Sequence, residues 1–262
     1  MPEGHVLHRL AHHLGEFAGE RLAASSPQGR FAAGAARIDG ARLDTAEAYG
    51  KHLLERFEGG RTVHVHLGQA GKLLRFPDPS QPPLPQVRLR LAGAGGAWDL
   101  IALSTCELLD DTGVGVLLAR LGPDPLRDDA DPKRAWANLH ARSGAIGAVL
   151  LDQSVIAGIG NIFRAEALFA CRLHPTRPAA SLTLDEFDRL WATVQAMMHR
   201  SVEEGRIVTV DPPASRPGME VPEPGAWYVY KQECCRRCGA AVESWTLGGR
   251  TMYACPVDQP VA

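Results

Sequence analysis

The spacing of hydrophobic residues changes along the chain. Leu7, Leu10, Leu14 and Phe17 recur at helical intervals, which predicts an amphipathic helix over residues 5–18. Apolar and polar residues then alternate at 63–67 and again at 87–91, a pattern typical of half-buried strands. Turn-rich stretches separate these segments. The pattern therefore predicts a β-rich domain over residues 1–118.

The second half of the chain shows helical patterns in place of the alternation typical of strands. A polar linker rich in Pro and Asp runs from Gly122 to Pro132, which favours a domain boundary there. Further on, Thr183 and Glu186 have the spacing of a helix-capping box, and apolar residues at helical intervals follow them. The proline-rich residues 211–225 predict a loop. Helices therefore dominate this half until the cysteine-rich segment at its end.

Composition narrows the class of protein without identifying it. The chain is 45% hydrophobic and 22% charged, as globular proteins are. We see no apolar run of the roughly 20 residues that a membrane helix needs and no signal peptide, so we expect a cytoplasmic protein. The formal net charge of −2 neither favours nor excludes a nucleic-acid partner, because basic residues can gather on one face. Four of them lie in the last 32 residues: Lys231, Arg236, Arg237 and Arg250.

Four chelating residues near the end of the chain have the spacing of a zinc site. The pattern is Cys235-x2-Cys238-x16-Cys255-x2-Asp258, and two such pairs joined by a hairpin can form a tetrahedron around one structural Zn²⁺. Asp258 stands where a cysteine is usual, which predicts a weaker site. Cys234 is an alternative fourth ligand, and a hairpin without metal is the alternative to a zinc site.

The amino-terminal residues Met1-Pro2-Glu3 could support nucleophilic chemistry. Removal of Met1 would expose the secondary amine of Pro2. An α-amino group has a pKa of about 7.7–8.0, so part of it is unprotonated and nucleophilic at neutral pH. Glu3 stands beside it as a proton donor or acceptor. The alternative is that Pro2 only directs removal of Met1.

Four segments in one order resemble the formamidopyrimidine-DNA glycosylase/endonuclease VIII family. They are Met1-Pro2-Glu3-Gly4, residues 50–54 (GKHLL), residues 151–162 (LDQ through GIGNI) and residues 249–253 (GRTMY). The likeness covers essentially the whole chain, and it looks closest to actinobacterial endonuclease VIII. It implies an α+β fold: a β-sandwich domain at 1–118, a helix–two-turn–helix domain at 119–225 and a β-hairpin zinc finger at 226–262.

The resemblance also implies catalytic roles for four residues. Pro2 would attack the anomeric carbon of the damaged nucleotide, expel the base and form a Schiff base. Glu3 would protonate the ring oxygen of the sugar. Lys51 would contact the phosphate beside the lesion and assist β-elimination, and Arg250 would assist the second, δ-elimination.

Three further residues match positions that contact DNA in the family. They are Gln69, Arg120 and Asn161, of which Asn161 begins a helix whose backbone amides could bind phosphate. The chain departs from the family at Val6, where many members have Glu, and at Gln69-Ala70, where a bulky wedge is usual. These departures bear on lesion choice and on how well the gap left by an extruded nucleotide is filled.

The leading hypothesis is therefore a monomeric base-excision-repair enzyme that binds damaged DNA and removes oxidised pyrimidines. An enzyme for oxidised purines would need the same residues. A protein that binds damaged DNA without cutting it would keep Asn161, Arg250 and the zinc hairpin but would not need Pro2 and Glu3. A zinc-stabilised regulator of protein partners would leave the amino-terminal residues unexplained.

Overall fold

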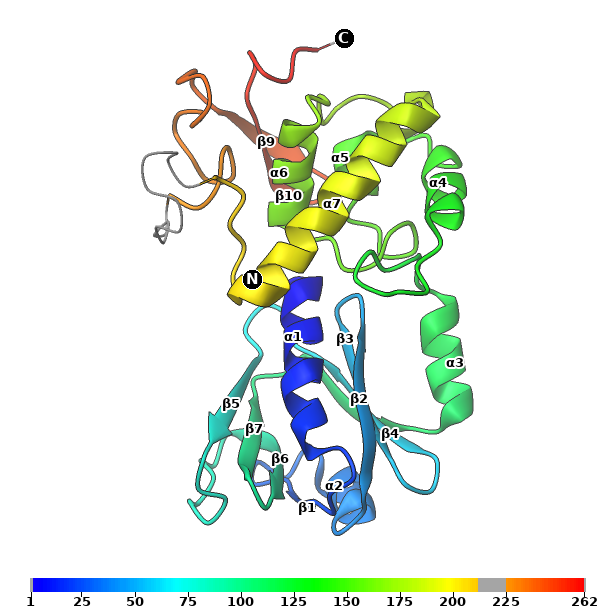
Figure 1. The fold of residues 1–262 in the computed structure, drawn as a ribbon, viewed down its shortest axis with the longest axis vertical. Coiled ribbons are helices and arrows are strands. Elements are labelled where there is room, and N and C mark those ends of the chain that lie inside the picture. Colours follow the sequence, from blue (N-terminus) through cyan, green and yellow to red (C-terminus); the bar gives the residue numbers. More distant parts are fainter. Residues whose placement is uncertain (1, 212–224, 262) are drawn as a thin grey trace. The chain divides into compact units, whose positions relative to one another are not determined.

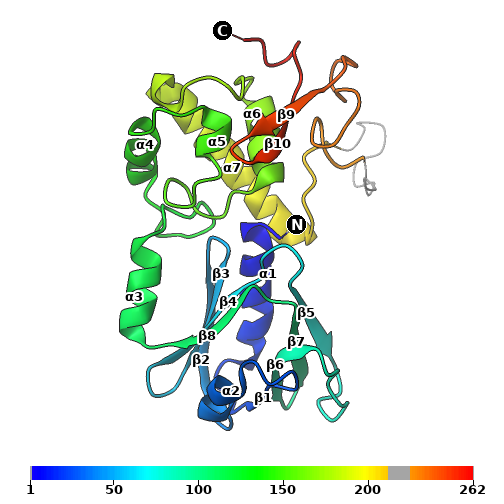
Figure 2. The ribbon, with the colours of Figure 1, turned by 180° about the vertical axis from the view of Figure 1, so that it is seen from behind.

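A computed structural model describes residues 2–211 and 225–261 of the chain. The chain divides into two compact units, Met1–Arg120 and Leu121–Ala262 (Figures 1 and 2). The first unit contains α1 (Gly4–Leu14), η1 (Gly15–Phe17), β1 (Ala23–Ser25), α2 (Ala32–Ile38), β2 (Leu43–Tyr49), β3 (His52–Phe57), β4 (Arg61–His66), β5 (Lys72–Phe76), β6 (Val87–Gly93), β7 (Gly96–Ile101), β8 (Thr105–Leu109) and α3 (Asp111–Ala119).

The strands of the first unit form two four-stranded antiparallel sheets, which confirms the predicted β-sandwich. Their orders are β1-β6-β7-β5 and β2-β3-β4-β8. Alternation in β4 places Val63 and Val65 in the core, whereas His64 and His66 belong to the opposite face, where α3 packs. Burial of the apolar face against the second sheet and α1 is therefore what specifies the register of these strands.

The first helix is shorter than its hydrophobic pattern predicts. α1 ends at Leu14, and residues Gly15–Phe17 continue as a single 3₁₀ turn. Glycine weakens a helix because it loses the most backbone freedom when it is ordered. Phe17 still reaches the core and is 2% exposed. The helical spacing of the apolar residues therefore predicted correctly that Phe17 is buried, although α1 ends three residues before Phe17.

The second unit is mainly helical, with a small hairpin near its end. Its elements are α4 (Pro132–His140), α5 (Ile146–Val149), α6 (Asn161–Ala170), η2 (Ala179–Ser181), α7 (Leu184–Glu204), β9 (Glu243–Leu247) and β10 (Arg250–Ala254). The predicted capping box is present: the Thr183 hydroxyl accepts from the Glu186 backbone, and the Glu186 carboxylate accepts from the Thr183 backbone. α7 then ends at Gly205, whose φ of 73° suits glycine.

Helix α6 lies at the centre of the second unit. Nine of its ten residues are buried, including the charged Arg164 and Glu166. The Glu166 carboxylate accepts hydrogen bonds from the backbone amides of residues 228, 229 and 230 and from the Thr209 hydroxyl. It thereby joins the segments before and after residues 212–224. The loop predicted over 211–225 lies almost entirely outside the described residues.

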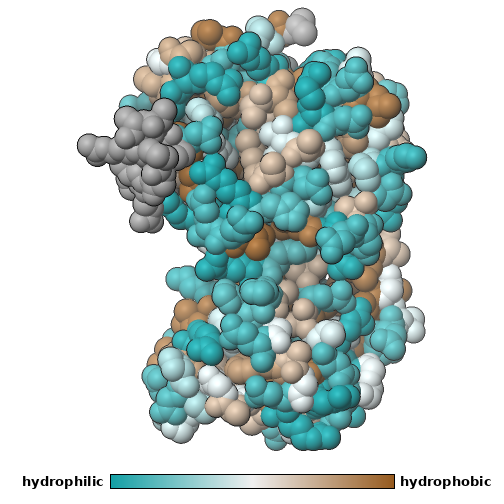
Figure 3. Space-filling model, in the orientation of Figure 1, coloured by the Kyte–Doolittle hydropathy of each residue, from teal (hydrophilic) through white to brown (hydrophobic). Residues whose placement is uncertain are grey.

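The surface offers little extended apolar area on the face shown in Figure 3. Hydrophilic residues cover most of that face, and hydrophobic residues form small separate patches. The large exposed hydrophobic side chains, such as Leu84 and Val116, are scattered along the sequence. Within the described ranges, no helix combines the length and apolar character that crossing a bilayer requires.

Candidate functional site

The amino-terminal pair lies at the start of α1. Glu3 is the residue before the helix, in extended conformation with φ −119°, and it is completely buried. Pro2 is half-buried. α1 packs against β2 and β3, and Gly4 and His5 at its start are buried. The structure thus places a carboxyl group, shielded from bulk water, directly beside the residue expected to act as nucleophile.

The other site residues predicted in the first unit lie on loops at this end of the sandwich. Figures 1 and 2 both show the β2–β3 and β4–β5 turns at the same end as the start of α1. Lys51 follows Gly50, whose φ of 57° makes the tight β2–β3 turn. Gln69 is exposed on the β4–β5 turn. Arg120 follows α3, and its charge and that of Lys51 both lower the pKa of His52, so both cations lie near that ring.

A cluster of three histidines next to Lys51 was not singled out in the sequence. His52 Nδ1 lies 2.8 Å from His64 Nε2, and the His52 and His66 rings have centroids 5.1 Å apart. Burial is the main reason why the pKa of His52 falls to about 3, with neighbouring charges adding to the effect. The sequence did contain a signal, since His64 and His66 alternate in β4 and share a face with the first residue of β3.

In the second unit, Asn161 and Arg250 are connected through the backbone of the hairpin. Asn161 is the first residue of α6 and is buried, and its amide Nδ2 donates to the carbonyl of Thr251 at 3.0 Å. Arg250 begins β10 directly after the Gly248-Gly249 turn, where both glycines have positive φ. The Asn161 side chain thus fixes the strand that carries Arg250.

Arg164 strengthens this connection, and the sequence analysis missed it. Its guanidinium is fully buried and donates to four carbonyl oxygens, those of Gly147, Leu247, Arg250 and Thr251, at 2.7–3.3 Å. A charge can be buried at tolerable cost only when such partners compensate for lost hydration. The sequence did contain a signal for a buried arginine, since Arg164 lies within the apolar run of α6.

We expect Arg164→Met to destabilise the protein strongly. The substitution keeps much of the side-chain volume but removes four hydrogen bonds, including the one to the buried Gly147 carbonyl, which costs roughly 2–5 kcal/mol. Urea denaturation would measure the loss. The matched control is Arg200→Met, which removes partly exposed ion pairs with Glu204 and Asp211 and should cost less than about 1 kcal/mol. Similar losses for both variants would contradict a special role for Arg164.

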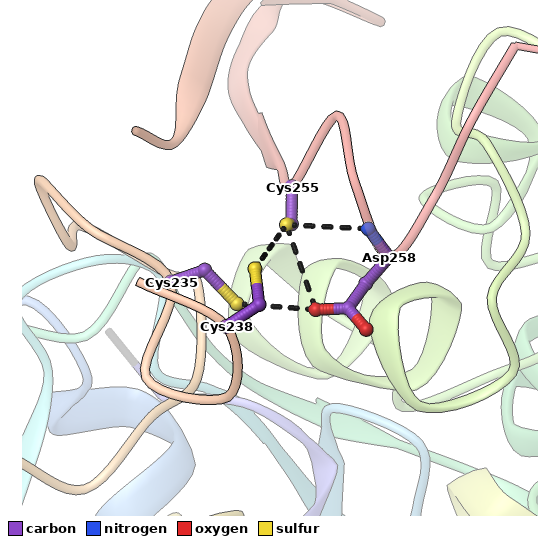
Figure 4. Close-up of side chains that lie close together, drawn as sticks. All are labelled: Cys235, Cys238, Cys255 and Asp258. Carbon is purple, nitrogen blue, oxygen red and sulfur yellow. Dashed lines mark hydrogen bonds between the residues drawn. The ribbon is translucent and has the colours of Figure 1, made fainter. Parts of the chain in front are cut away.

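The four residues of the predicted metal site converge (Figure 4). One ligand atom from each of Cys235, Cys238, Cys255 and Asp258 can be chosen so that all lie within 4.8 Å of one another. The Asp258 Oδ2 atom is 3.4 Å from the Cys235 sulfur and 3.6 Å from that of Cys255. Three sulfurs and one carboxylate oxygen can surround an ion of the size of zinc.

Surrounding contacts favour Asp258 over Cys234 as the fourth ligand. Cys234 is exposed and forms a backbone bridge with Ala241, and it is not part of the convergent group. The loop that carries Asp258 is fixed by Gln259, which accepts from the Cys255 amide and donates to the Leu173 carbonyl. Arg237 contributes positive charge 3.6 Å from Asp258. These residues could therefore hold one metal ion.

The zinc occupancy and zinc affinity of the site should depend on which residue is the fourth ligand. Asp258→Ala is expected to lower zinc occupancy, and Asp258→Cys to raise zinc affinity above that of the unsubstituted protein, because thiolate is a softer ligand. Mass spectrometry under native conditions and competition with a chelator would measure both. Cys234→Ser is the control and should bind zinc normally. If Cys234→Ser lost zinc while Asp258→Ala bound it normally, Cys234 and not Asp258 would be the fourth ligand.

Comparison with known proteins agrees with this arrangement. The formamidopyrimidine-DNA glycosylase N-terminal domain matches residues 1–100, and the formamidopyrimidine-DNA glycosylase H2TH domain matches residues 121–211. Endonuclease 8 1 of Mycobacterium tuberculosis is 43% identical, with 99% of this chain and 100% of that protein covered. Formamidopyrimidine-DNA glycosylase of Thermomicrobium roseum is 34% identical, over 87% and 85% of the two chains.

Solved structures share the fold at lower sequence identity. A complex between Lactococcus lactis Fpg and DNA containing an abasic site superposes with a TM-score of 0.80 at 21% identity, covering 99% of this chain and 100% of that one. A second Lactococcus lactis complex, of a mutant Fpg with DNA containing Fapy-dG, gives the same TM-score of 0.80 at 22% identity, with the same coverage. The chain therefore belongs to the formamidopyrimidine-DNA glycosylase/endonuclease VIII family of base-excision-repair glycosylases.

Proposed function

We propose that this enzyme removes oxidised pyrimidines from DNA and then cleaves the strand, with Pro2 as nucleophile. The observation that carries the proposal is the start of α1: a half-buried Pro2 beside a fully buried Glu3, at the end of the sandwich where the turn bearing Lys51 lies. A binding protein would have no need of this pair. Family membership supports the same interpretation, since formamidopyrimidine-DNA glycosylase and endonuclease 8 are the names of its relatives.

The chemistry begins once Met1 is removed. Glu3 gives its proton to the ring oxygen of the sugar, which opens the ring, and the Pro2 nitrogen bonds to the anomeric carbon. The base leaves with the electrons of its glycosidic bond and gains a proton, and the sugar is left as an iminium ion on Pro2. The iminium then acidifies the adjacent C–H bond. Loss of that proton expels the 3′ phosphate by β-elimination.

Lys51 and Arg250 would stabilise the phosphates that leave. Lys51 lies on a tight turn at the same end of the first unit as Pro2, and Arg250 begins a strand fixed by Asn161 and Arg164. A fixed cation lowers the energy of a developing phosphate charge at little reorganisation cost. We assign Lys51 to β-elimination and Arg250 to the δ-elimination that follows.

The remaining predicted residues would hold the DNA. We propose that Arg120 and the start of α6 at Asn161 contact phosphates, and that Gln69 enters the stack where the damaged nucleotide has been extruded. Cys235, Cys238, Cys255 and Asp258 would hold Zn²⁺, which when bound supplies structural rigidity to the hairpin and no chemistry to the reaction. We infer that the enzyme acts as a monomer on damaged DNA at the nucleoid.

Trapping with borohydride tests the proposal. The reagent reduces an iminium to a stable amine, so incubation with an abasic-site duplex should give a covalent adduct. Peptide mapping by mass spectrometry should find the adduct on the peptide that begins with Pro2. An adduct on Lys51 would show that Lys51, and not Pro2, is the nucleophile. Tight binding of the duplex without any adduct or strand cleavage would support a binding protein instead.

Oxidised purines are the second candidate substrate. The 34% identity to a formamidopyrimidine-DNA glycosylase favours them, whereas the 43% identity to endonuclease 8 1 favours the endonuclease VIII branch. A panel of duplexes, each with one oxidised base, separates the two. We expect faster single-turnover release of oxidised pyrimidines than of formamidopyrimidine or 8-oxoguanine. The reverse order would assign the chain to purine repair.

A further inference from the structure

The carboxylate of Asp258 presents its two oxygen atoms to different surroundings. The Oδ2 atom faces the sulfurs, 3.4 Å from that of Cys235 and 3.6 Å from that of Cys255. The Oδ1 atom lies 3.6 Å from a guanidinium nitrogen of Arg237. Figure 4 shows the same division, with one carboxylate oxygen among the sulfurs and the other turned away from them. One oxygen is therefore available to a metal ion, while the other belongs to an ion pair.

Arg237 is held in place by two aromatic rings. Its guanidinium carbon lies 4.3 Å from the centroid of the Phe169 ring and 5.3 Å from that of the Tyr228 ring. Phe169 belongs to α6 and is fully buried, and the two rings stack with centroids 5.1 Å apart. A guanidinium over such rings gains cation–π attraction and is restricted in its orientation. Arg237 thus meets Asp258 from a fixed position, although 35% of its side chain is exposed.

Backbone contacts hold the rings and the metal-site loops together. The Tyr228 amide donates to a buried carboxylate on α6, and the Tyr228 carbonyl accepts from the amide of Arg236. Gln259 fixes the backbone beside Asp258 through bonds to other main-chain groups. Within the residues that the structure describes, Arg237 is the one cation paired with the Asp258 carboxylate itself. The direction of that carboxylate therefore depends on Arg237.

An aspartate ligand needs such a partner more than a cysteine ligand does. A cysteine has a single ligand atom, whereas a carboxylate has two equivalent oxygens and one more torsion angle. Without a partner, a carboxylate can turn either oxygen toward an ion or turn both away. Three thiolates and a carboxylate also carry more negative charge than one Zn²⁺ neutralises, which favours a nearby cation. Outer partners that orient ligand atoms commonly change metal affinity by about 10–100-fold.

We propose that Arg237 is the positioning residue that makes Asp258 an effective fourth zinc ligand. The inference rests on the proposed zinc site. Arg237 pairs with Oδ1, which directs Oδ2 toward the sulfurs, and the rings of Phe169 and Tyr228 keep the guanidinium at that point. Two side chains together thereby do what a cysteine at position 258 would do alone.

Competition with a chelator for Zn²⁺, in the full-length protein, tests the assignment. Arg237→Met keeps the apolar contact with the rings but removes the charge, so zinc affinity should fall by about 10-fold. Combined with Asp258→Cys, the same substitution should lower zinc affinity by less than about 3-fold, because a thiolate has no second atom for Arg237 to orient. An arginine that served only to pack the metal site on α6 would give equal losses with and without Asp258→Cys.

Arg236→Met is the matched control. It removes the neighbouring exposed arginine, whose side chain bonds to Gln232, and it changes the net charge equally, so the variant should bind zinc normally. Tight zinc binding by the double variant would show that Arg237→Met still folds around the metal. Equal losses for Arg236→Met and Arg237→Met, or equal losses with and without Asp258→Cys, would overturn the assignment of Arg237. Failure of the unsubstituted protein to bind zinc would overturn the proposed zinc site, and this inference with it.

Discussion

Replacing Glu3 by Gln is expected to slow release of a damaged base by a factor of about 10²–10⁴, the range for loss of a general acid. Glutamine has nearly the same shape but has no carboxyl proton to give to the sugar ring oxygen. Strand cleavage at a preformed abasic site should continue, because that substrate has already lost its base and opens its ring unaided. Single-turnover assays with the two substrates would measure this separation.

Two controls distinguish a catalytic role of Glu3 from a structural one. The control is Glu16→Gln, which alters a half-exposed carboxylate on η1 and should leave both reactions unchanged. Because Glu3 is fully buried, its substitution could also disturb folding, so the abasic-site reaction serves as an internal test of the intact site. Equal losses with both substrates would assign Glu3 to a shared step, such as formation of the Schiff base.

Glu55 should make the protein less stable as the pH rises. It lies on β3 with its side chain completely buried, and neither carboxyl oxygen has a hydrogen-bond partner. Burial raises its pKa from 4.5 to about 8. The folded protein therefore binds up to one more proton than the unfolded chain between these values, and the unfolding free energy falls by about 1.4 kcal/mol for each pH unit. Above pH 8 the contribution is constant.

Two variants separate the charge of Glu55 from its polarity. Glu55→Leu should be more stable than the unsubstituted protein by several kcal/mol near pH 8, with the difference shrinking toward pH 4.5. Glu55→Gln should lose the same pH dependence but gain less stability, because a buried amide still lacks partners. Urea denaturation at several pH values gives these differences. Parallel stability curves for all three proteins would show that Glu55 does not titrate in this range.

Local patterns were sufficient for much of the fold. Alternation at 63–67 and 87–91 corresponds to β4 and β6, and Thr183 with Glu186 caps α7 as predicted. These features depend on residues close in sequence, so a single chain reveals them. The end of α1 was wrong by one turn, because apolar spacing continues to Phe17 while Gly15 ends the helix. The convergence of the candidate metal-ligating residues also followed directly from their spacing.

Long-range contacts explain what the sequence could not reveal. Arg164 and Glu166 are close together in α6, yet their partners lie at 147 and 247–251 for the arginine and at 209 and 228–230 for the carboxylate. The contact between His64 and Glu107, 2.8 Å from Nδ1 to Oε1, likewise depends on the pairing of β8 with β4. Glu55 interrupts an apolar strand, and its isolation depends on every neighbour around it.

The sequence by itself determined the family, the two-part architecture of sandwich and helices, and the candidate residues from Pro2 to Asp258. The predicted helices and strands and the candidate metal-ligating residues rest on periodicity and on residues at fixed spacing, which short-range geometry translates directly into structure. The family, the sandwich and the candidate catalytic and DNA-binding residues rest instead on the resemblance of four segments to known sequences. The tertiary structure alone decided which polar groups lose their water and which partners replace it. Hydration is lost or compensated by residues distant in the chain, so the buried Glu3, Glu55, His64 and Arg164 acquire their chemistry only when the fold closes around them.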